Sequence, residues 1–355
     1  MSLIGKNSLG LGYGLVATDL IIAPMIPSLT ARGGGVIYPL LKALSEVFTG
    51  SSHDPKMGAF LTISAFQGTA ITSAMFLTAM AGNPLIAEFA RTQGIHVTWL
   101  SWAIAASIPG LISLIVVPYV IYSLISPTIK KTPHAKEFAL DKLRRMGKMK
   151  SQEWIMLATF VFLIVLWALG SFLGVKATVA AMAGVSILLL TGVIRWKDVL
   201  EEHSAWDTFI WFSTLITLPG FLNKYGFGSW FSNWVVFHIS GFEWVAGFLI
   251  IALVYFYSHY FFASNLAHIT VMYVPFLIIS ISLGTPAHLA ALVLGFFSSL
   301  FGGLTHYGSG PAPILFGTGY ATIGEWWKMG AIAGLLNIVI WMGIGGIWWK
   351  FLGLW

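Results

Sequence analysis

The chain has 355 residues, of which 57% are hydrophobic, 15% aromatic and only 9% charged, with a formal net charge of +6 and no cysteine. Because a soluble domain carries about 25% charged residues, a folded chain of this composition would expose large apolar patches to water. This excludes a soluble globular protein, and the absence of cysteine excludes disulfides and thiolate metal sites. The sequence therefore predicts an all-α polytopic membrane protein.

The first apolar stretch, residues 9–48, is interrupted at its centre. The interruption contains prolines, polar side chains and three glycines, namely Pro24, Pro27, Ser28, Thr30, Arg32, Gly33, Gly34 and Gly35. Non-helical backbone at membrane depth is tolerated only where it is buried in protein or lines a wet cavity. The stretch therefore predicts a re-entrant helical hairpin.

Two further segments complete a first unit, residues 1–125. Residues 57–84 predict a discontinuous helix interrupted at Thr72-Ser73-Ala74-Met75, and residues 97–125 predict an uninterrupted helix long enough to span a bilayer. The polar segment 126–153 follows and contains eight of the 19 Lys and Arg residues. Because basic loops remain on the cytoplasmic side, we expect this segment to be a cytoplasmic linker.

The second unit, residues 154–355, follows a similar plan. Its apolar stretches predict scaffold helices within 154–222, a second re-entrant hairpin at 243–282, a discontinuous helix at 288–320 and a last helix at 328–349. The hairpin is interrupted at Ser264-Asn265-Leu266-Ala267-His268, and the discontinuous helix at 305–311.

The two interrupted hairpins share a spacing. Eleven residues separate Ser28 from Pro39 and Ser264 from Pro275, and a potential cation stands four residues after each serine. Paired discontinuous helices in corresponding positions of two halves indicate inverted repeats and a secondary transporter with its site near the membrane midplane. Ser264 lies 110 residues after Trp154, whereas only 27 residues precede Ser28. We therefore expect the N-terminal scaffold helices of the first repeat to be missing from this chain.

The interrupted segments predict an anion site. Helix ends expose unpaired N–H groups and a partial positive charge, and several such ends around one cavity favour an anion. Arg32 and His268 could add positive charge to this site, since an arginine within an apolar hairpin is costly and is a functional candidate by default. Alternatively, Arg32 caps carbonyl groups or pairs with a structural acid such as Asp19, and His268 is a neutral core histidine. No metal site is predicted, because no acid accompanies His259 and His268.

Four stretches around these interruptions carry a family resemblance: SLTARGGGVIYPLLKALSE, AMFLTAMAGNPLIAEFA, FYSHYFFASNLAHITVMY and FGGLTHYGSGPAPILFGTGY. They resemble the divalent-anion/sodium symporter (DASS) family, in particular its branch of citrate:succinate and tartrate:succinate antiporters and the plastid 2-oxoglutarate/malate translocator. The resemblance covers essentially the whole chain. It implies a homodimer in which each protomer moves a transport domain against a scaffold by elevator-type alternating access.

The resemblance also implies the residues that hold the substrate. In the family, Ser-Asn-Thr tips of the two hairpins bind the carboxylates; here Leu29 stands where the first tip would have an amide, and Leu266 stands where the second would have a hydroxyl. The candidate substrate-binding residues are Ser28, Leu29, Thr30, Arg32, Thr72, Ser73, Ser264, Asn265, Leu266, His268, Ser309, Gly310 and Pro311. Exchanger members imply that Arg32 and His268 replace the charge of sodium.

The expected function is exchange of di- or tricarboxylates such as succinate, malate, 2-oxoglutarate, tartrate or citrate across a bacterial inner membrane. We expect no enzyme activity, because the chain has no HExxH motif, no paired intramembrane aspartates and no cysteine. No cofactor is expected. The alternatives are a sodium-coupled symporter, in which Na⁺ would be bound, and a truncated remnant that does not transport.

Overall fold

The computed structural model describes residues 7–49, 55–132, 135–203 and 243–355, together with scattered residues between 205 and 230. These residues are almost entirely helical and contain no β-strand, only an isolated bridge between Asn7 and Lys131. Five of the described helices are long and apolar enough to cross a membrane. The expectation of an all-α polytopic membrane protein is confirmed.

The first unit contains two helical interruptions. Its elements are α1 (Ser8–Ile22), η1 (Ala31–Ile37), α2 (Tyr38–Thr49), α3 (Pro55–Met75), α4 (Gly82–Thr92) and α5 (Trp99–Ile125). The first interruption, residues 23–28, separates α1 from the helical residues 29–30 and the π-helical turns of η1.

The second interruption lies later than the sequence predicted. Thr72–Met75 form the last turn of α3, and the break follows at residues 76–81. The hydroxyl of Ser73 donates to the carbonyl oxygen of Thr69 at 2.6 Å, four residues earlier. A serine or threonine bonded to its own helix in this way is compatible with continued helix, which explains why the polar residues do not mark the break.

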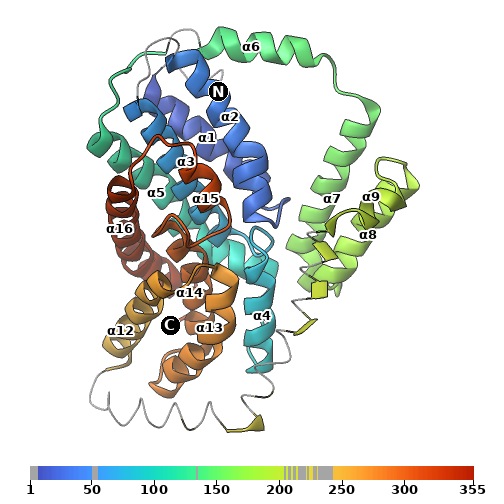
Figure 1. Cartoon of the computed structure of the whole chain (residues 1–355). Coiled ribbons are helices and arrows are strands. Elements are labelled where there is room, and N and C mark those ends of the chain that lie inside the picture. Colours follow the sequence, from blue (N-terminus) through green and yellow to red (C-terminus); the bar gives the residue numbers. More distant parts are fainter. Residues whose placement is uncertain are drawn as a thin grey trace.

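The polar segment 126–153 contains a helix that was not predicted, α6 (Ala135–Met146). It leads to α7 (Ser151–Leu173), α8 (Ala177–Leu190) and α9 (Trp196–Leu200), which lie to one side of the other helices in Figure 1. Most of the scaffold helix expected near 205–222 lies outside the described residues.

The segments predicted as the second hairpin and the second discontinuous helix both contain breaks between helices. Their elements are α12 (Trp244–Tyr257), η2 (Ser258–Phe261), α13 (Asn265–Ser282), α14 (Ala287–Leu300), η3 (Phe301–Gly303) and α15 (Pro311–Phe316). Asn265–His268 are the first turn of α13 rather than part of the break, which is confined to residues 262–264. The chain ends in α16 (Ile323–Val339), η4 (Ile340–Gly345) and α17 (Gly346–Phe351).

The two discontinuous helices form the core. Residues 57–75 of α3 are all buried, as are residues 289–300 of α14. A helix that is apolar on every side is stable only when protein or lipid surrounds it. Helices α1 and α5 pack against α3, while α12 and α13 pack against α14 (Figure 1). The helical breaks therefore lie inside the protein.

Helix α16 passes very close to the backbone that follows α14, at Gly303 and Leu304. A Cβ atom added at Gly330 would overlap the carbonyl oxygen of Leu304 and lie 2.9 Å from that of Gly303. Backbone atoms cannot turn aside as a flexible side chain can. Gly330 therefore sets the distance between α16 and the segment that follows η3.

We expect Gly330→Ala to lower the free energy of unfolding by about 1–3 kcal/mol, because an added methyl group forces a packed backbone apart. The matched control is Gly324→Ala in the same helix, where an added Cβ meets nothing within 4 Å. Thermal unfolding of the purified protein in detergent measures both. Equal melting temperatures for the two variants would show that the contact at Gly330 is unimportant.

Candidate functional site

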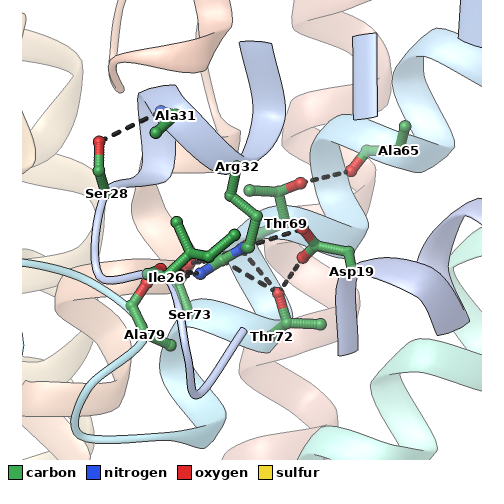
Figure 2. A network of polar contacts seen from close by, with 10 residues as sticks. All are labelled: Asp19, Ile26, Ser28, Ala31, Arg32, Ala65, Thr69, Thr72, Ser73 and Ala79. Carbon is green, nitrogen blue, oxygen red and sulfur yellow. Dashed lines mark hydrogen bonds and ion pairs between the residues drawn. The ribbon is translucent and has the colours of Figure 1, made fainter. Parts of the chain in front are cut away.

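Arg32, on the first turn of η1, lies at the centre of a buried polar network (Figure 2). Its Nε–H donates to Oδ1 of Asp19 in α1 at 2.8 Å, and both side chains are fully buried, with 0% and 1% of their surface exposed. The remaining N–H groups donate to oxygen atoms of the first hairpin and the first discontinuous helix. These acceptors are the carbonyl groups of Ile26, Thr69 and Ala79 and the hydroxyl groups of Thr72 and Ser73.

The network occupies the whole guanidinium. An arginine has five N–H donors, and in this structure oxygen atoms of the protein accept from all of them. The other carboxylate oxygen of Asp19 accepts from the hydroxyl of Thr72. Arg32 therefore has no N–H left for a substrate, and it joins the first interruption to the last turns of α3 and to the break that follows.

The alternative in which Arg32 pairs with Asp19 and caps carbonyls is thus the one that the structure shows. The positive charge of Arg32 is therefore compensated, because the Asp19 carboxylate pairs with it at 2.8 Å. Thr72 and Ser73 are brought to the predicted site, but their hydroxyl groups are used within this network.

The tip of the first hairpin remains accessible. Ser28 and Leu29 are half-buried and Thr30 is exposed. Oγ of Ser28 accepts from the backbone N–H of Ala31 at 3.1 Å, so its own hydroxyl hydrogen remains available. A Cβ atom added at Gly310 would overlap Oγ1 of Thr30. This tip therefore lies against the segment between η3 and α15.

The backbone of η1 also approaches α15. An added Cβ at Gly33 would lie 2.7 Å from Cβ of Pro311. Gly33 therefore permits a close contact between the first hairpin and the start of α15.

The polar residues at the tip of the second hairpin have different hydrogen-bond partners and exposure from those of the first. Ser264 caps α13, its Oγ accepting from the backbone N–H of Ala267 at 3.5 Å, and it is only half-buried. Asn265 is buried and donates through Nδ2 to the carbonyl oxygen of Ser298 at 2.8 Å. Leu266 is half-buried. Of these three, Ser264 is the residue with a polar group directed to an accessible surface.

His268 is fully buried in a chain of contacts that includes a second histidine. Its Nε2 lies 3.0 Å from Oγ of Ser258, and its Nδ1 lies 3.2 Å from Nδ1 of His259. Nε2 of His259 lies 2.8 Å from the carbonyl oxygen of Gly308. Nothing in the sequence indicates that His259 meets both His268 and Gly308.

The two hairpins therefore converge on one segment, residues 308–311. His259 of the second hairpin contacts Gly308, Thr30 of the first contacts Gly310, and Gly33 contacts Pro311. Ser309, between these contacts, is buried. Of the substrate-binding candidates outside this segment, Thr30 meets Gly310 directly, and His268 reaches the segment only through His259.

Two amide side chains that the sequence analysis missed support the breaks. Asn83 donates to the carbonyl groups of Ser73 and Phe76 at 2.8 and 3.0 Å, and Gln67 donates to that of Gly303 at 2.7 Å. Amides flanking an interruption, such as Asn83 between Gly82 and Pro84, are a signal that could have identified them. Among the described residues, no group of three or more His, Asp or Glu side chains is placed to hold a metal ion.

Apolar helices that pack around two breaks, with polar side chains buried between them, define a helical membrane protein with an internal polar site. A family described as the sodium:sulfate symporter transmembrane region matches residues 1–355, and the chain belongs to this family.

Relatives with named functions agree with this assignment. The chain is 50% identical over 361 residues to the chloroplastic dicarboxylate transporter 1 of Arabidopsis thaliana, covering 99% of this chain and 64% of that protein. It is 51% identical over 355 residues to the putative malate transporter YflS of Bacillus subtilis (99% and 74%) and 33% identical over 357 residues to the citrate/succinate antiporter of Escherichia coli (99% and 72%). The chain thus spans less than two thirds of the length of the Arabidopsis protein.

We expect Asp19→Asn to destabilise the protein by about 3–5 kcal/mol, because it leaves the buried Arg32 charge without a counter-ion. Replacing both residues, as in Asp19→Asn with Arg32→Gln, should restore part of the loss, because no unpaired charge remains. Unfolding in denaturant gives the free energy of unfolding of the single variant, the double variant and the wild-type protein.

The matched control is Glu88→Gln, which breaks the exposed pair of Glu88 with Arg91 at 2.6 Å. A surface pair contributes about 0–1 kcal/mol, so this variant should unfold close to wild type. An Asp19→Asn variant as stable as Glu88→Gln would contradict the structural role of the buried pair.

Proposed function

We propose that the protein exchanges di- and tricarboxylates across a membrane, binding them between the two hairpin tips and residues 308–311. The observation that carries the proposal is the convergence of Thr30, Gly33 and His259 on this one segment, beside accessible hydroxyl groups. Short hydroxyl donors and backbone N–H groups at helix ends suit carboxylate oxygens. The substrate names of the relatives, which are dicarboxylates, malate and citrate or succinate, support the same class.

The order of elements supports a repeat. In each unit an interrupted hairpin precedes a helix that breaks and resumes: α1 to α4 in the first, α12 to α15 in the second. We propose that residues 1–125 and 154–355 are inverted repeats joined by a cytoplasmic linker. In this proposal the two hairpins and two broken helices move together as the transport domain of an elevator, and α7 and α8 belong to the scaffold.

Exchange has a simple physical requirement, namely that the empty site does not cross the membrane. An uncompensated charge at the site imposes such a barrier, because moving it through a low-dielectric path is costly. Since Asp19 neutralises Arg32, this role falls to groups of the second hairpin, where His268 has no acidic partner.

The remaining features of the proposal concern the assembly and its location. We propose a homodimer in the inner membrane of a bacterium, in which each protomer carries one anion site. The anion is bound and moved without chemical change.

Counterflow in proteoliposomes tests this function. Vesicles loaded with unlabelled succinate, malate or 2-oxoglutarate are offered a trace of the same labelled anion, with and without Na⁺. Uptake that needs internal anion and ignores Na⁺ is the expected result. Uptake that requires an inward Na⁺ gradient and no internal anion would instead establish sodium symport, and no uptake by folded protein would reject transport.

We expect Thr30→Val to raise the KM for the anion by about tenfold or more, because it removes a hydroxyl that donates to a charged carboxylate while keeping the side-chain shape. Counterflow rates over a range of anion concentrations give this value. The control is Thr191→Val at the end of α8, where the exposed hydroxyl donates only to its own helix. Equal KM values in the two variants would remove Thr30 from the site.

A further inference from the structure

We infer that α6 is an interfacial helix whose apolar face lies in an anionic phospholipid leaflet. Its place in the chain fixes where it lies. Helix α5 ends at Ile125 and α7 begins at Ser151, and both are long and apolar enough to cross a membrane. Because α6 connects the ends of these two helices, it lies at one surface of the membrane.

The connection to α7 is short. Only residues 147–150 separate the end of α6 at Met146 from the start of α7, so the two helix ends are at most about 17 Å apart. Trp154, in the first turn of α7, is exposed, and tryptophan is typical of the level where lipid meets water. The C-terminal end of α6 is therefore held close to the headgroups.

The direction of α6 suits this position. Figure 1 shows it running across the top of the molecule, from the side of α5 toward α7, whereas α7 descends from that level. A helix of 12 residues is about 18 Å long. Lying along the surface rather than upright, it keeps its whole length at one depth of the interface.

The two faces of α6 differ in chemistry. At 3.6 residues per turn, Leu140, Leu143 and Met146 follow one another around one side of the helix. Asp141 and Arg145 stand on the opposite side, where Oδ2 of Asp141 accepts from Nε of Arg145 at 2.8 Å. A helix with one apolar and one charged face is the kind that lies in the plane of a membrane interface.

The apolar face is uncovered in the part of the chain that the structure describes. Leu143 and Met146 expose 62% and 79% of their surface, and Leu140 is also exposed. Large apolar side chains in water lose the free energy that burial would provide. A leaflet at this level supplies the missing contact, because the acyl chains begin just below the headgroups.

The charge of the segment selects an anionic leaflet. Residues 126–153 contain eight Lys and Arg against three Asp and Glu, and so carry most of the net charge of +6. Arg144 and Lys148, in and after the last turn of α6, are exposed. Long basic side chains can keep their stems on apolar surface while the charged ends reach the headgroups, and anionic lipid attracts a basic segment beside it.

Both faces of α6 therefore fit the same partner. A soluble protein would have to approach α6 at the level of the headgroups, where lipid is already present. The cytoplasmic side proposed for this segment is also the side whose leaflet carries anionic lipid. This contact depends only on the chain crossing a membrane, and not on what the protein transports.

Spin labels on the full-length chain in nanodiscs test the contact. Because the chain has no cysteine, Leu143→Cys places a single label on the apolar face, and Asp141→Cys is the matched control on the polar face. In phosphatidylglycerol, the label at 143 should be more accessible to oxygen, which concentrates among acyl chains, than to a water-soluble nickel complex. The label at 141 should show the reverse.

Lipid charge and salt distinguish the leaflet from other partners. In phosphatidylcholine, or at high salt, the label at 143 should become accessible to the nickel complex, because the attraction is absent or screened. Equal accessibility at 141 and 143 in phosphatidylglycerol would overturn the inference. So would a label at 143 that is shielded alike in both lipids and in detergent, since this chain or a second copy would then cover the face.

A charge variant tests the role of the basic residues. One positive charge near an anionic leaflet changes binding about fivefold. Arg144→Gln in the Leu143→Cys background should therefore lower the ratio of lipid-bound to water-exposed spectral components about fivefold, at a salt concentration where both are present. An unchanged ratio would overturn the selection of the leaflet by charge.

The matched control is Lys350→Gln, which removes one positive charge far from α6. The neighbouring Trp349 donates to the carbonyl oxygen of Ala105 at 2.9 Å, near the start of α5, whereas α6 follows the end of α5. This variant should leave the ratio unchanged. Equal losses in the two variants would show that the net charge of the protein attracts the lipid, and would overturn a site on α6.

Discussion

A helix that breaks inside a membrane leaves carbonyl groups that neither lipid nor the helix itself can satisfy, and this constraint determines how the polar residues are used. Arg32 donates to carbonyl groups of the first interruption, of α3 and of the break after α3, with Asp19 supplying its counter-charge. Asn83 donates to the end of α3, while Gln67 and Asn265 do the same around α14 and η3. Much of the polarity buried in these apolar helices therefore serves the backbone, and fewer groups remain for a ligand.

This division explains what could be predicted from sequence. Prolines and polar residues within apolar stretches marked segments in which the helices are broken, because such residues are costly in lipid wherever they occur. They did not locate the break after α3, since the hydroxyl of Ser73 bonds within its own helix. Nor could the spacing show that Arg32 is fully engaged or that His259 meets His268, because both depend on which donors already have partners in three dimensions.

The two halves follow one plan with different chemistry at the equivalent position. Four residues after each tip serine stands a basic side chain, Arg32 or His268. The arginine is held in a fixed ion pair, so its contribution to the charge of the site does not change. The histidine has no such ion pair and instead meets another histidine and aromatic rings. The basic side chain at the same offset is therefore engaged by a carboxylate in the first half, and by an imidazole and aromatic rings in the second.

Charge balance then limits how an exchanger could work. Were Arg32 and His268 both unpaired, a bound dianion would meet two positive charges and leave none over. With Asp19 beside Arg32, the arginine offsets none of the charge of the dianion. The N-terminus of α13, at the second tip, contributes about half a positive charge. The remaining negative charge is left to further backbone dipoles or to protons that the anion itself carries, so the arginine does not set the electrical cost of crossing.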